Sequence, residues 1–262
     1  MRARSLITVE RRDGRDRLVD VRCEPPLTVR QCHDRILLVG STAAPVGGDE
    51  LHTDVHVGAG ASARVGSAAA TLVWPGPRGE SSSTSTSIVV AERAHLDWRP
   101  EPVVSVTGSV HRASTTLDLD ATASCRFVEE VALGRHDEPA GDLELFVRVR
   151  RSGRTLLAHT ERFGANSPGA GSLAAVADAG HVVCAVLVGA SSHGDQWRGD
   201  RSVAIGDSVS SAAATLPIAD DATVVLAVGV DRLDAWRFVA LVAPALANAG
   251  SPIDPQRPLP TG

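Results

Sequence analysis

Two residue types are missing from this chain of 262 residues, which contains no lysine and no tyrosine. All 26 residues counted as lysine plus arginine are therefore arginines. Without lysine there is no Walker A lysine, no pyridoxal Schiff base and no catalytic amine, and without tyrosine the reductases that use a tyrosine acid are excluded. Aromatic residues make up only 3% of the chain and the formal net charge is −5. Nucleic-acid binding favours a basic face and stacking rings, so we expect no nucleic-acid partner.

Long hydrophobic runs and cysteines are also scarce. The longest apolar runs, 182–190, 222–230 and 238–247, have about ten residues, roughly half of a membrane span. The charged start, 1–15, lacks the apolar stretch of a secretory signal. The chain has too few and too scattered cysteines for a disulfide scaffold, namely Cys23, Cys32, Cys125 and Cys184. We therefore expect a soluble, cytoplasmic protein with reduced thiols and no membrane segment.

The pattern of the first part of the chain predicts β-structure. From about residue 6 to residue 150, short runs of alternating polar and apolar residues follow one another, separated by glycine, proline or aspartate turns. Their spacing of about ten residues predicts a mainly β fold, a large two-layer β-sheet assembly of many short strands. A further strand pair is expected through 155–162, and buried strands over 181–189 and 222–230.

The C-terminal third is expected to add a few helices. Apolar residues recur at helical spacing over 231–248, where Pro244 marks a kink or a boundary, and a short helical or turn segment is expected at 172–179. We expect a single β-rich domain over 1–250 followed by a proline-rich tail over 251–262.

The stretch from Val46 to Trp74 carries the most informative pattern. It opens with the turn V-G-G-D, which ends at Asp49. The residues of 50–57 then alternate as in a half-buried strand, and a second glycine turn at 58–61 leads into a return run. These features predict a β-hairpin.

Three polar side chains share one face of the first of these strands. His52, Asp54 and His56 point the same way because alternate residues of a strand do so. With a fourth ligand they could bind nickel or zinc. The alternative, which we favour, is that they are the solvated face of an amphipathic strand.

Three later segments add to this pattern in a fixed order. The first, A-H-L-D-W-R-P-E-P-V over 94–103, is a strand that ends at a proline corner and holds Glu101 extended. The second, over 129–135, reads E-E-V-A-L-G-R, and the third, over 156–162, reads L-L-A-H-T-E-R. Together with the G-G-D-E-L and G-A-S-A-R-V runs after residue 46, they resemble the UreD (UreH) family of urease accessory proteins. One departure is S-T-A-A-P before the shared turn, where members commonly carry a glycine-rich run, and another is Leu72–Val73–Trp74 where they carry a lysine-tyrosine pair.

The resemblance implies a urease maturation factor that is not an enzyme. Such proteins form a complex with UreF and with the GTPase UreG, and the complex docks on apo-urease. Nickel is thought to pass through an interior channel of UreD to the urease active site. The resemblance thus implies no stably bound cofactor, only nickel in transit. The missing Walker A lysine agrees with nucleotide hydrolysis in a partner.

The resemblance also marks candidate residues for the nickel path. Asp49, in the glycine turn, and Glu161, in the third segment, match family carboxylates associated with such a path, and Glu129 is a third candidate. The alternative for Asp49 is a turn residue that bonds its own backbone. For Glu129 it is an internal ion pair with Arg135 or another arginine.

Two other functions stay open. One is a metal-dependent or serine hydrolase that uses the strand of His52 and His56. The other is a β-rich interaction scaffold unrelated to urease.

Overall fold

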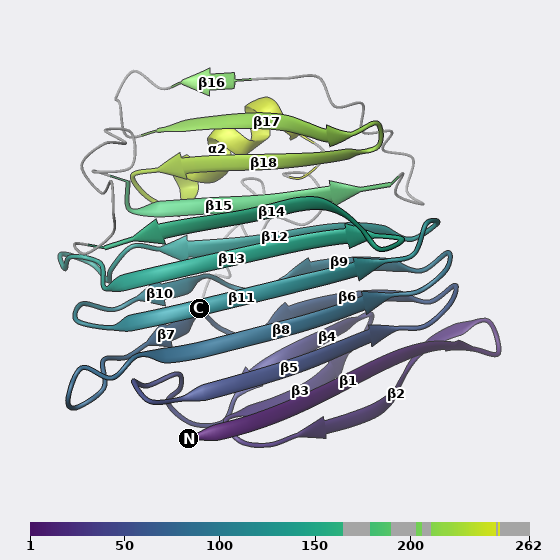
Figure 1. The fold of residues 1–262 in the computed structure, drawn as a ribbon, viewed down its shortest axis with the longest axis horizontal. Coiled ribbons are helices and arrows are strands. Elements are labelled where there is room, and N and C mark those ends of the chain that lie inside the picture. Colours follow the sequence, from purple (N-terminus) through teal and green to yellow (C-terminus); the bar gives the residue numbers. More distant parts are fainter. Residues whose placement is uncertain (165–178, 190–202, 206–210, 245, 247–262) are drawn as a thin grey trace, which may run out of the picture.

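The computed structural model describes residues 1–164, 179–189, 203–205, 211–244 and 246, which form two β-sheets packed face to face (Figure 1). Sheet A has seven strands, in spatial order β14 (Arg154–Phe163), β13 (Asp142–Arg151), β11 (Val110–Leu119), β8 (Ser82–Val90), β5 (Glu50–Val57), β1 (Arg2–Arg12) and β2 (Arg15–Cys23). Sheet B runs β16 (Val203–Ile205), β17 (Ala212–Ala219), β18 (Ala222–Gly229), β15 (His181–Val188), β12 (Ser124–Ala132), β9 (His95–Arg99), β6 (Ser62–Ser67), β4 (Arg35–Gly40) and β3 (Leu27–Cys32). Its two short strands β7 (Thr71–Val73) and β10 (Val103–Ser105) pair with each other, and β10 also pairs with β12. The predicted two-layer β architecture is confirmed.

The chain alternates between the two sheets as it advances. In sheet A, β1, β5, β8, β11 and β13 are parallel neighbours, and in sheet B the same holds for β4, β6, β9 and β12. Parallel neighbours require a crossover, which is usually a helix. Here a strand of the opposite sheet serves as the crossover, so each circuit of the chain adds one strand to each layer.

This alternation makes the predicted hairpin wrong. β5 belongs to sheet A and β6 to sheet B, so the turn at 58–61 carries the chain from one layer to the other. The alternation of apolar residues is nevertheless as predicted, because Val55 and Val57 are buried on β5 while Ala63 and Val65 are buried on β6. Both strands turn their apolar side toward the space between the sheets.

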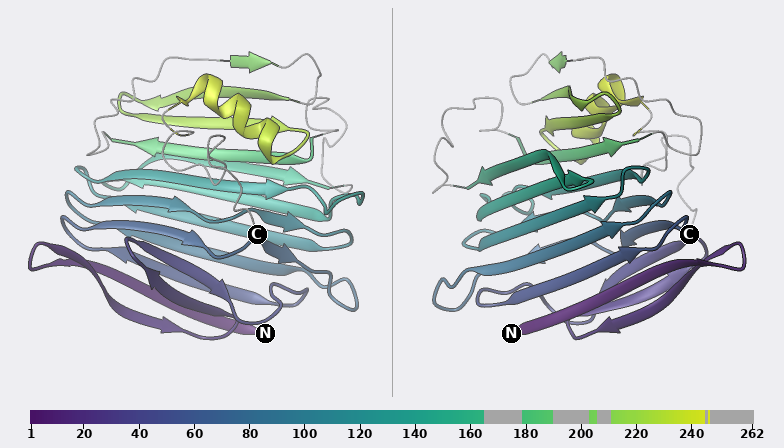
Figure 2. Two further views of the ribbon diagram at one scale, coloured as in Figure 1. Left: turned by 180° about the vertical axis from the view of Figure 1, so that it is seen from behind. Right: turned by 45° about the vertical axis from the view of Figure 1, so that its right-hand side comes forward.

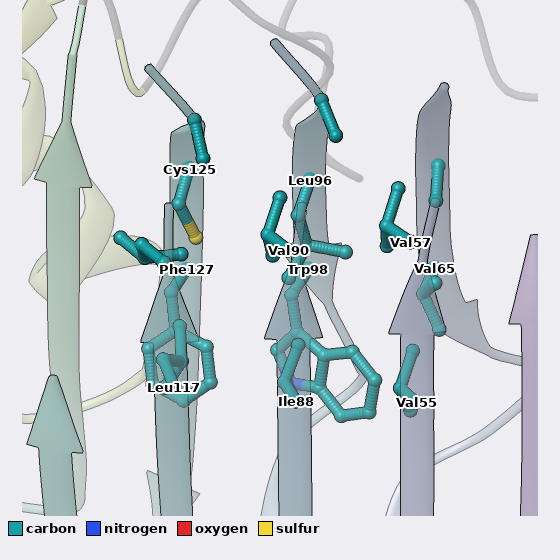
Figure 3. Close-up of a cluster of buried hydrophobic side chains, with 14 of the residues drawn as sticks. Val55, Val57, Val65, Ile88, Val90, Leu96, Trp98, Leu117, Cys125 and Phe127 are labelled. Atoms are coloured by element: carbon teal, nitrogen blue, oxygen red, sulfur yellow. The ribbon is translucent and has the colours of Figure 1, made fainter. Parts of the chain in front are cut away.

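The hydrophobic core fills the space between the two sheets at one end of the sandwich. This is the end where the parallel strands of sheet A have their C-terminal residues. Figure 3 shows Ile88 and Leu117 of sheet A beside Trp98 and Phe127 of sheet B. Ile88, Leu117 and Phe127 are at most 1% exposed. Full burial of a side chain of this kind stabilises a fold by about 1.5–3 kcal/mol, so the inter-sheet contact is the main source of stability.

The C-terminal strands and helix form a second core on the outer side of sheet B. β15 and β18 are almost wholly buried, as predicted. Helix α2 (Arg232–Val242) lies across the outer face of β15, β17 and β18 (Figure 2, left). Its N-cap Asp231 accepts a hydrogen bond from the backbone of Asp234. The helix ends just before Pro244, as a proline boundary requires, and is shorter than the predicted 231–248.

Not all of the apolar residues that recur at helical spacing over 231–248 pack on the sheet. Ala235, Trp236, Val239 and Val242 are buried, whereas Leu233 and Leu241 are 43% and 70% exposed. Except for residue 179, the segment expected at 172–179 lies outside the described residues, as does the tail at 251–262. The single domain over 1–250 stays a prediction.

Candidate functional site

The side chains on the inner face of sheet A change from hydroxyl to apolar along its strands. Four hydroxyl side chains stand in one row across neighbouring strands, because Ser5 pairs with Thr53, Thr53 with Thr86, and Thr86 with Thr115. The apolar core begins two residues farther along, with Val55 and its neighbours. At the row of hydroxyls the two sheets flank a partly open cavity of about 480 Å³ instead of a packed core.

The opposite wall of the cavity lies at an interruption in sheet B. β9 pairs with β12 only as far as Phe127, and β10 resumes the pairing at Val131. The chain between β9 and β10 is Pro100–Glu101–Pro102, and proline has no N–H to donate to a strand ladder. Residues 128–130 of β12 therefore have no strand partner on that side.

Carboxylates gather in the wall of this cavity. The acidic residues that line it are Glu24, Glu101, Glu129 and Glu130. No arginine lines the cavity among the described residues, although the chain contains 26 arginines. Its lining therefore consists of acidic, hydroxyl and apolar groups together with His52, and the carboxylates favour cations over anions.

Glu129 is the sequence-predicted candidate that lines the cavity. Its Oε1 accepts a 2.7 Å hydrogen bond from the Thr115 hydroxyl. Burial raises the pKa of Glu129 to about 7, although the Thr115 bond lowers it, and the charge of Glu161 raises it further. The predicted ion pair with Arg135 is wrong, because the guanidinium of Arg135 lies 2.8 Å from a carboxylate oxygen of Glu138.

Glu161 lies in the same interior region, on β14. It is opposite Leu145 in the pairing of β13 with β14, and its Oε1 lies 2.9 Å from Nε2 of His159. That bond raises the pKa of His159 above its ordinary value, against the effect of burial. The charge of Glu161 acts on both Glu129 and Cys184, which face each other in the pairing of β12 with β15. The structure thus brings Glu129 and Glu161 together, but Glu161 does not line the cavity.

Asp49 lies apart from Glu129 and Glu161. Its carboxylate accepts a 2.8 Å hydrogen bond from the backbone N–H of Val46 and forms an ion pair with the amino group of Met1. The side chain is buried and is not part of the cavity wall. Gly48 has a φ of 92°, which the turn requires. The alternative for Asp49, a turn residue that bonds its own backbone, is confirmed.

The side of β5 that carries the histidines faces away from the packed core, as favoured above, although His52 also contributes to the cavity lining. His52 lies 2.7 Å from the Ser85 hydroxyl through Nδ1 and 3.0 Å from Asp54 through Nε2, while His56 is exposed. Val55, between them, is fully buried on the other side of the strand. In the described parts of the chain, no group of three or more histidine, cysteine or acidic side chains is arranged to hold a metal ion.

An ion cluster at the interruption in sheet B was not foreseen from the sequence. Arg232, the first residue of α2, donates from Nη1 to Glu101 at 2.8 Å and from Nε to Glu130 at 2.8 Å. His181 approaches Glu130 at 3.2 Å. Burial raises the pKa of Glu130, but the bonds from His181 and Arg232 outweigh it and keep that pKa below its ordinary value. The P-E-P motif marked Glu101, but nothing in the local sequence marks its partner.

None of the described helices has the length and apolarity needed to cross a membrane.

Comparison with known proteins agrees with the family resemblance of the sequence segments described above. A family model described as UreD urease accessory protein matches residues 1–258. Urease accessory protein UreD of Parafrankia sp. is 34% identical over 290 residues, covering 100% of this chain and 93% of the relative. UreD 3 of Streptomyces griseus is 35% identical over 229 residues, covering 84% and 87%. UreD 2 of Saccharopolyspora erythraea is 40% identical over 162 residues, covering 60% of this chain and only 57% of the relative. The chain belongs to the UreD family of urease accessory proteins.

Proposed function

We propose that this chain is a cytoplasmic, non-enzymatic maturation factor that joins UreF and UreG on apo-urease and helps deliver nickel to the urease active site. Its family supplies the biological context. The observation that carries the proposal is the inter-sheet cavity, whose wall has four glutamates and, among the described residues, no arginine. Such a space admits a divalent cation in a molecule that otherwise presents many guanidinium groups.

The lining suits an ion that must move on. Carboxylates and hydroxyls are oxygen ligands of moderate strength for nickel, whereas a closed set of thiolates would retain it. The hydroxyl row from Ser5 to Thr115 leads to the carboxylate of Glu129, which Thr115 holds in place. Because Glu129 titrates near neutral pH, it exchanges a proton for a cation at little cost. In this account nickel is cargo and occupies no permanent site.

The test is urease activation in cells that carry the urease genes together with a Glu129→Gln variant of this chain. The amide keeps the size of the side chain but removes its charge, so we expect severalfold lower urease activity at limiting nickel and recovery when nickel is raised. The matched control is Glu144→Gln, because Glu144 carries the same charge and pairs with Arg162. Activation equal to that of the unaltered chain would contradict the proposal. Co-purification tests the joint complex with UreF and UreG.

The second candidate, hydrolysis, has one observation in its favour. Ser85, His52 and Asp54 form a line of hydrogen bonds with the residue types of a catalytic triad. However, serine contacts Nδ1 and aspartate contacts Nε2, the reverse of the usual arrangement. We expect purified protein to hydrolyse p-nitrophenyl acetate no faster than its His52→Ala variant does. Faster turnover that His52→Ala abolishes would favour the hydrolase.

A further inference from the structure

Sheet B continues beyond sheet A at one end of the sandwich. In the described part of the chain the last strand of sheet A is β14, whose Leu157 packs against the same core as Leu226 of β18. Sheet B then adds β17 and β16, which lie past β14 (Figure 1; Figure 2, right). Among the described residues, no strand of sheet A lies opposite β16 and the start of β17.

The pairing of β16 with β17 shows which side chains turn toward this space. Ala204 and Ala213 are paired, and both pack in the second core beneath helix α2, on the outer side of sheet B. Since consecutive residues of a strand point to opposite faces, Val203 and Ile205 turn to the inner side. They are 68% and 77% exposed. The same alternation turns 212 and 214 of β17 inward.

These inward residues form an apolar surface, which we call the overhang and define as Val203 and Ile205 of β16 with Ala214 and Ala212 of β17. In the pairing, Val203 is opposite Ala214 and Ile205 is opposite Ala212. Large side chains on the outermost strand therefore lie beside small ones on the next strand. Such an arrangement is complementary to a surface in which small and large side chains are exchanged.

The overhang also lacks the charges that protect other sheet edges. Charged side chains on an edge strand oppose its pairing with another chain. At the opposite end of the sandwich, edge strand β2 reads R-D-R-L-V-D-V-R-C. Strands β16, β17 and β18 contain no acidic or basic residue. An exposed apolar surface without such protection is typical of an interface.

The occupant that fits the overhang is a second copy of this chain. It must be apolar, because a charged side chain would lose its water there without gaining a partner. Sheet B exceeds sheet A at this end, so a copy related by a two-fold axis parallel to the strands places its own overhang in the space beside β14. The large side chains of each overhang then meet the alanines of the other.

We propose that two copies of this chain associate through the overhang, with Val203 and Ile205 of each copy packed on Ala214 and Ala212 of the other. Strand β16 of each copy then lies beside β14 of its partner. None of the four residues lines the cavity, so the inference is independent of the proposed function. The contact is small, and we expect a reversible dimer with a dissociation constant of about 1–100 μM.

The experiment is sedimentation velocity of the purified full chain at concentrations from about 1 to 300 μM, a range that brackets the expected constant. We expect a monomer–dimer equilibrium. Val203→Arg should weaken the dimer at least about tenfold, because the guanidinium would be buried against alanine. The matched control is Val21→Arg, because Val21 is also an exposed valine of an edge strand, β2, but lies at the opposite end of the sandwich. It should leave association unchanged.

A mixture of two variants tests the proposed geometry. Ala214→Glu alone should also weaken the dimer, but mixing it with Val203→Arg should restore association, because the arginine of one copy then faces the glutamate of the other. Circular dichroism of each variant checks that it is folded. If Ala214→Glu does not fold, the unaltered chain, Val203→Arg and the control still decide the question.

An unaltered chain that stays monomeric over the whole concentration range would overturn the inference. That is also the result expected if another segment of the chain or a different protein covers the overhang. An equal effect of the control and Val203→Arg would overturn it too, and so would folded variants that associate no better mixed than alone.

Discussion

Glu129 and Glu130 show how two neighbouring residues of one type acquire opposite electrostatic roles. Glu129 faces the inter-sheet cavity with a hydroxyl as its partner, and burial raises its pKa to about 7. Glu130 faces the helix, where bonds from His181 and Arg232 outweigh burial and lower its pKa. The difference comes from the partner that each side of the strand supplies.

Glu129 should make stability depend on pH. The unfolded chain releases this proton near pH 4.5, the ordinary pKa of a glutamate side chain, whereas the folded chain holds it up to about pH 7. The folded protein therefore binds more protons between these values, and stability falls as pH rises through this window. We expect Glu129→Gln to raise the melting temperature at pH 8 and to have a much smaller effect at pH 4.5, with an upper bound of about 3 kcal/mol. Thermal unfolding at both pH values tests this, and an equal effect at both would contradict the assigned environment.

His111 should have the opposite effect on the pH dependence of stability: it should make stability fall as the pH is lowered. It is 2% exposed, and Ser82 and Thr84 contact its two ring nitrogens at 2.8 and 3.1 Å. Burial lowers its pKa to about 4 from the ordinary histidine value of 6.5, against a hydrogen bond that raises it. The unfolded chain therefore binds more protons between pH 6.5 and 4, and stability is lost as pH falls through that window.

The variant His111→Asn keeps hydrogen-bonding groups but does not titrate. It should lower stability at pH 7 yet reduce the further loss on acidification, by up to about 3 kcal/mol between pH 6.5 and 4. Urea unfolding at the two pH values measures the difference. A variant with the same acid slope as the unaltered chain would show that His111 is not kept neutral by the fold.

Among the elements, the glycine turn at 46–49 determines how the chain enters strand β5. A Cβ at Gly47 would collide with the carbonyl oxygen of Glu80 and the backbone of Gly76. The turn therefore packs backbone against backbone with the loop before β8, and Asp49 closes it through Val46.

Gly47→Ala should therefore destabilise the protein severely, by about 2–4 kcal/mol, because a backbone must move to admit the methyl group. The comparison is Gly14→Ala, since Gly14 also lies in a turn, at a φ of 73°, but has open space around the added atom. That change should cost only about 1 kcal/mol of backbone strain. Chemical denaturation of both variants tests the claim, and equal losses would show that the close approach is not rigid.

The sequence predicted the strands better than their partners. Alternation over 50–57 identifies Val55 as buried because the period of a strand is two residues. That period does not say which strand lies alongside, so the change of sheet between β5 and β6 was interpreted as a hairpin. In β12 even the faces are hard to assign, because Val128 and Val131 are both buried, one against the helix and one against sheet A. Arg232 lies 102 residues from Glu130, beyond the reach of any local pattern.

At the scale of the whole molecule, the strands that successive circuits of the chain add to a sheet are parallel. Residues at equivalent positions of these strands therefore form rows across the sheet. A row of hydroxyls in place of valines lines the cavity, and the proline corner beside Glu101 interrupts the facing sheet at the same level. The carboxylates that line this space come from connections and strands far apart in the chain. The cavity is thus a property of the fold as a whole, and we expect that a single carboxylate within it, Glu129, can be neutralised without disturbing the packed core.

The most direct measurement is the nickel content of urease purified from cells that express this chain with Glu129→Gln. The account predicts severalfold less nickel per urease active site than with the unaltered chain or with Glu144→Gln, at equal and limiting nickel supply. Since Glu129→Gln is expected to be at least as stable at pH 8 as the unaltered chain, misfolding would not explain the loss. Urease with a full nickel content would contradict the claim that this cavity carries the ion.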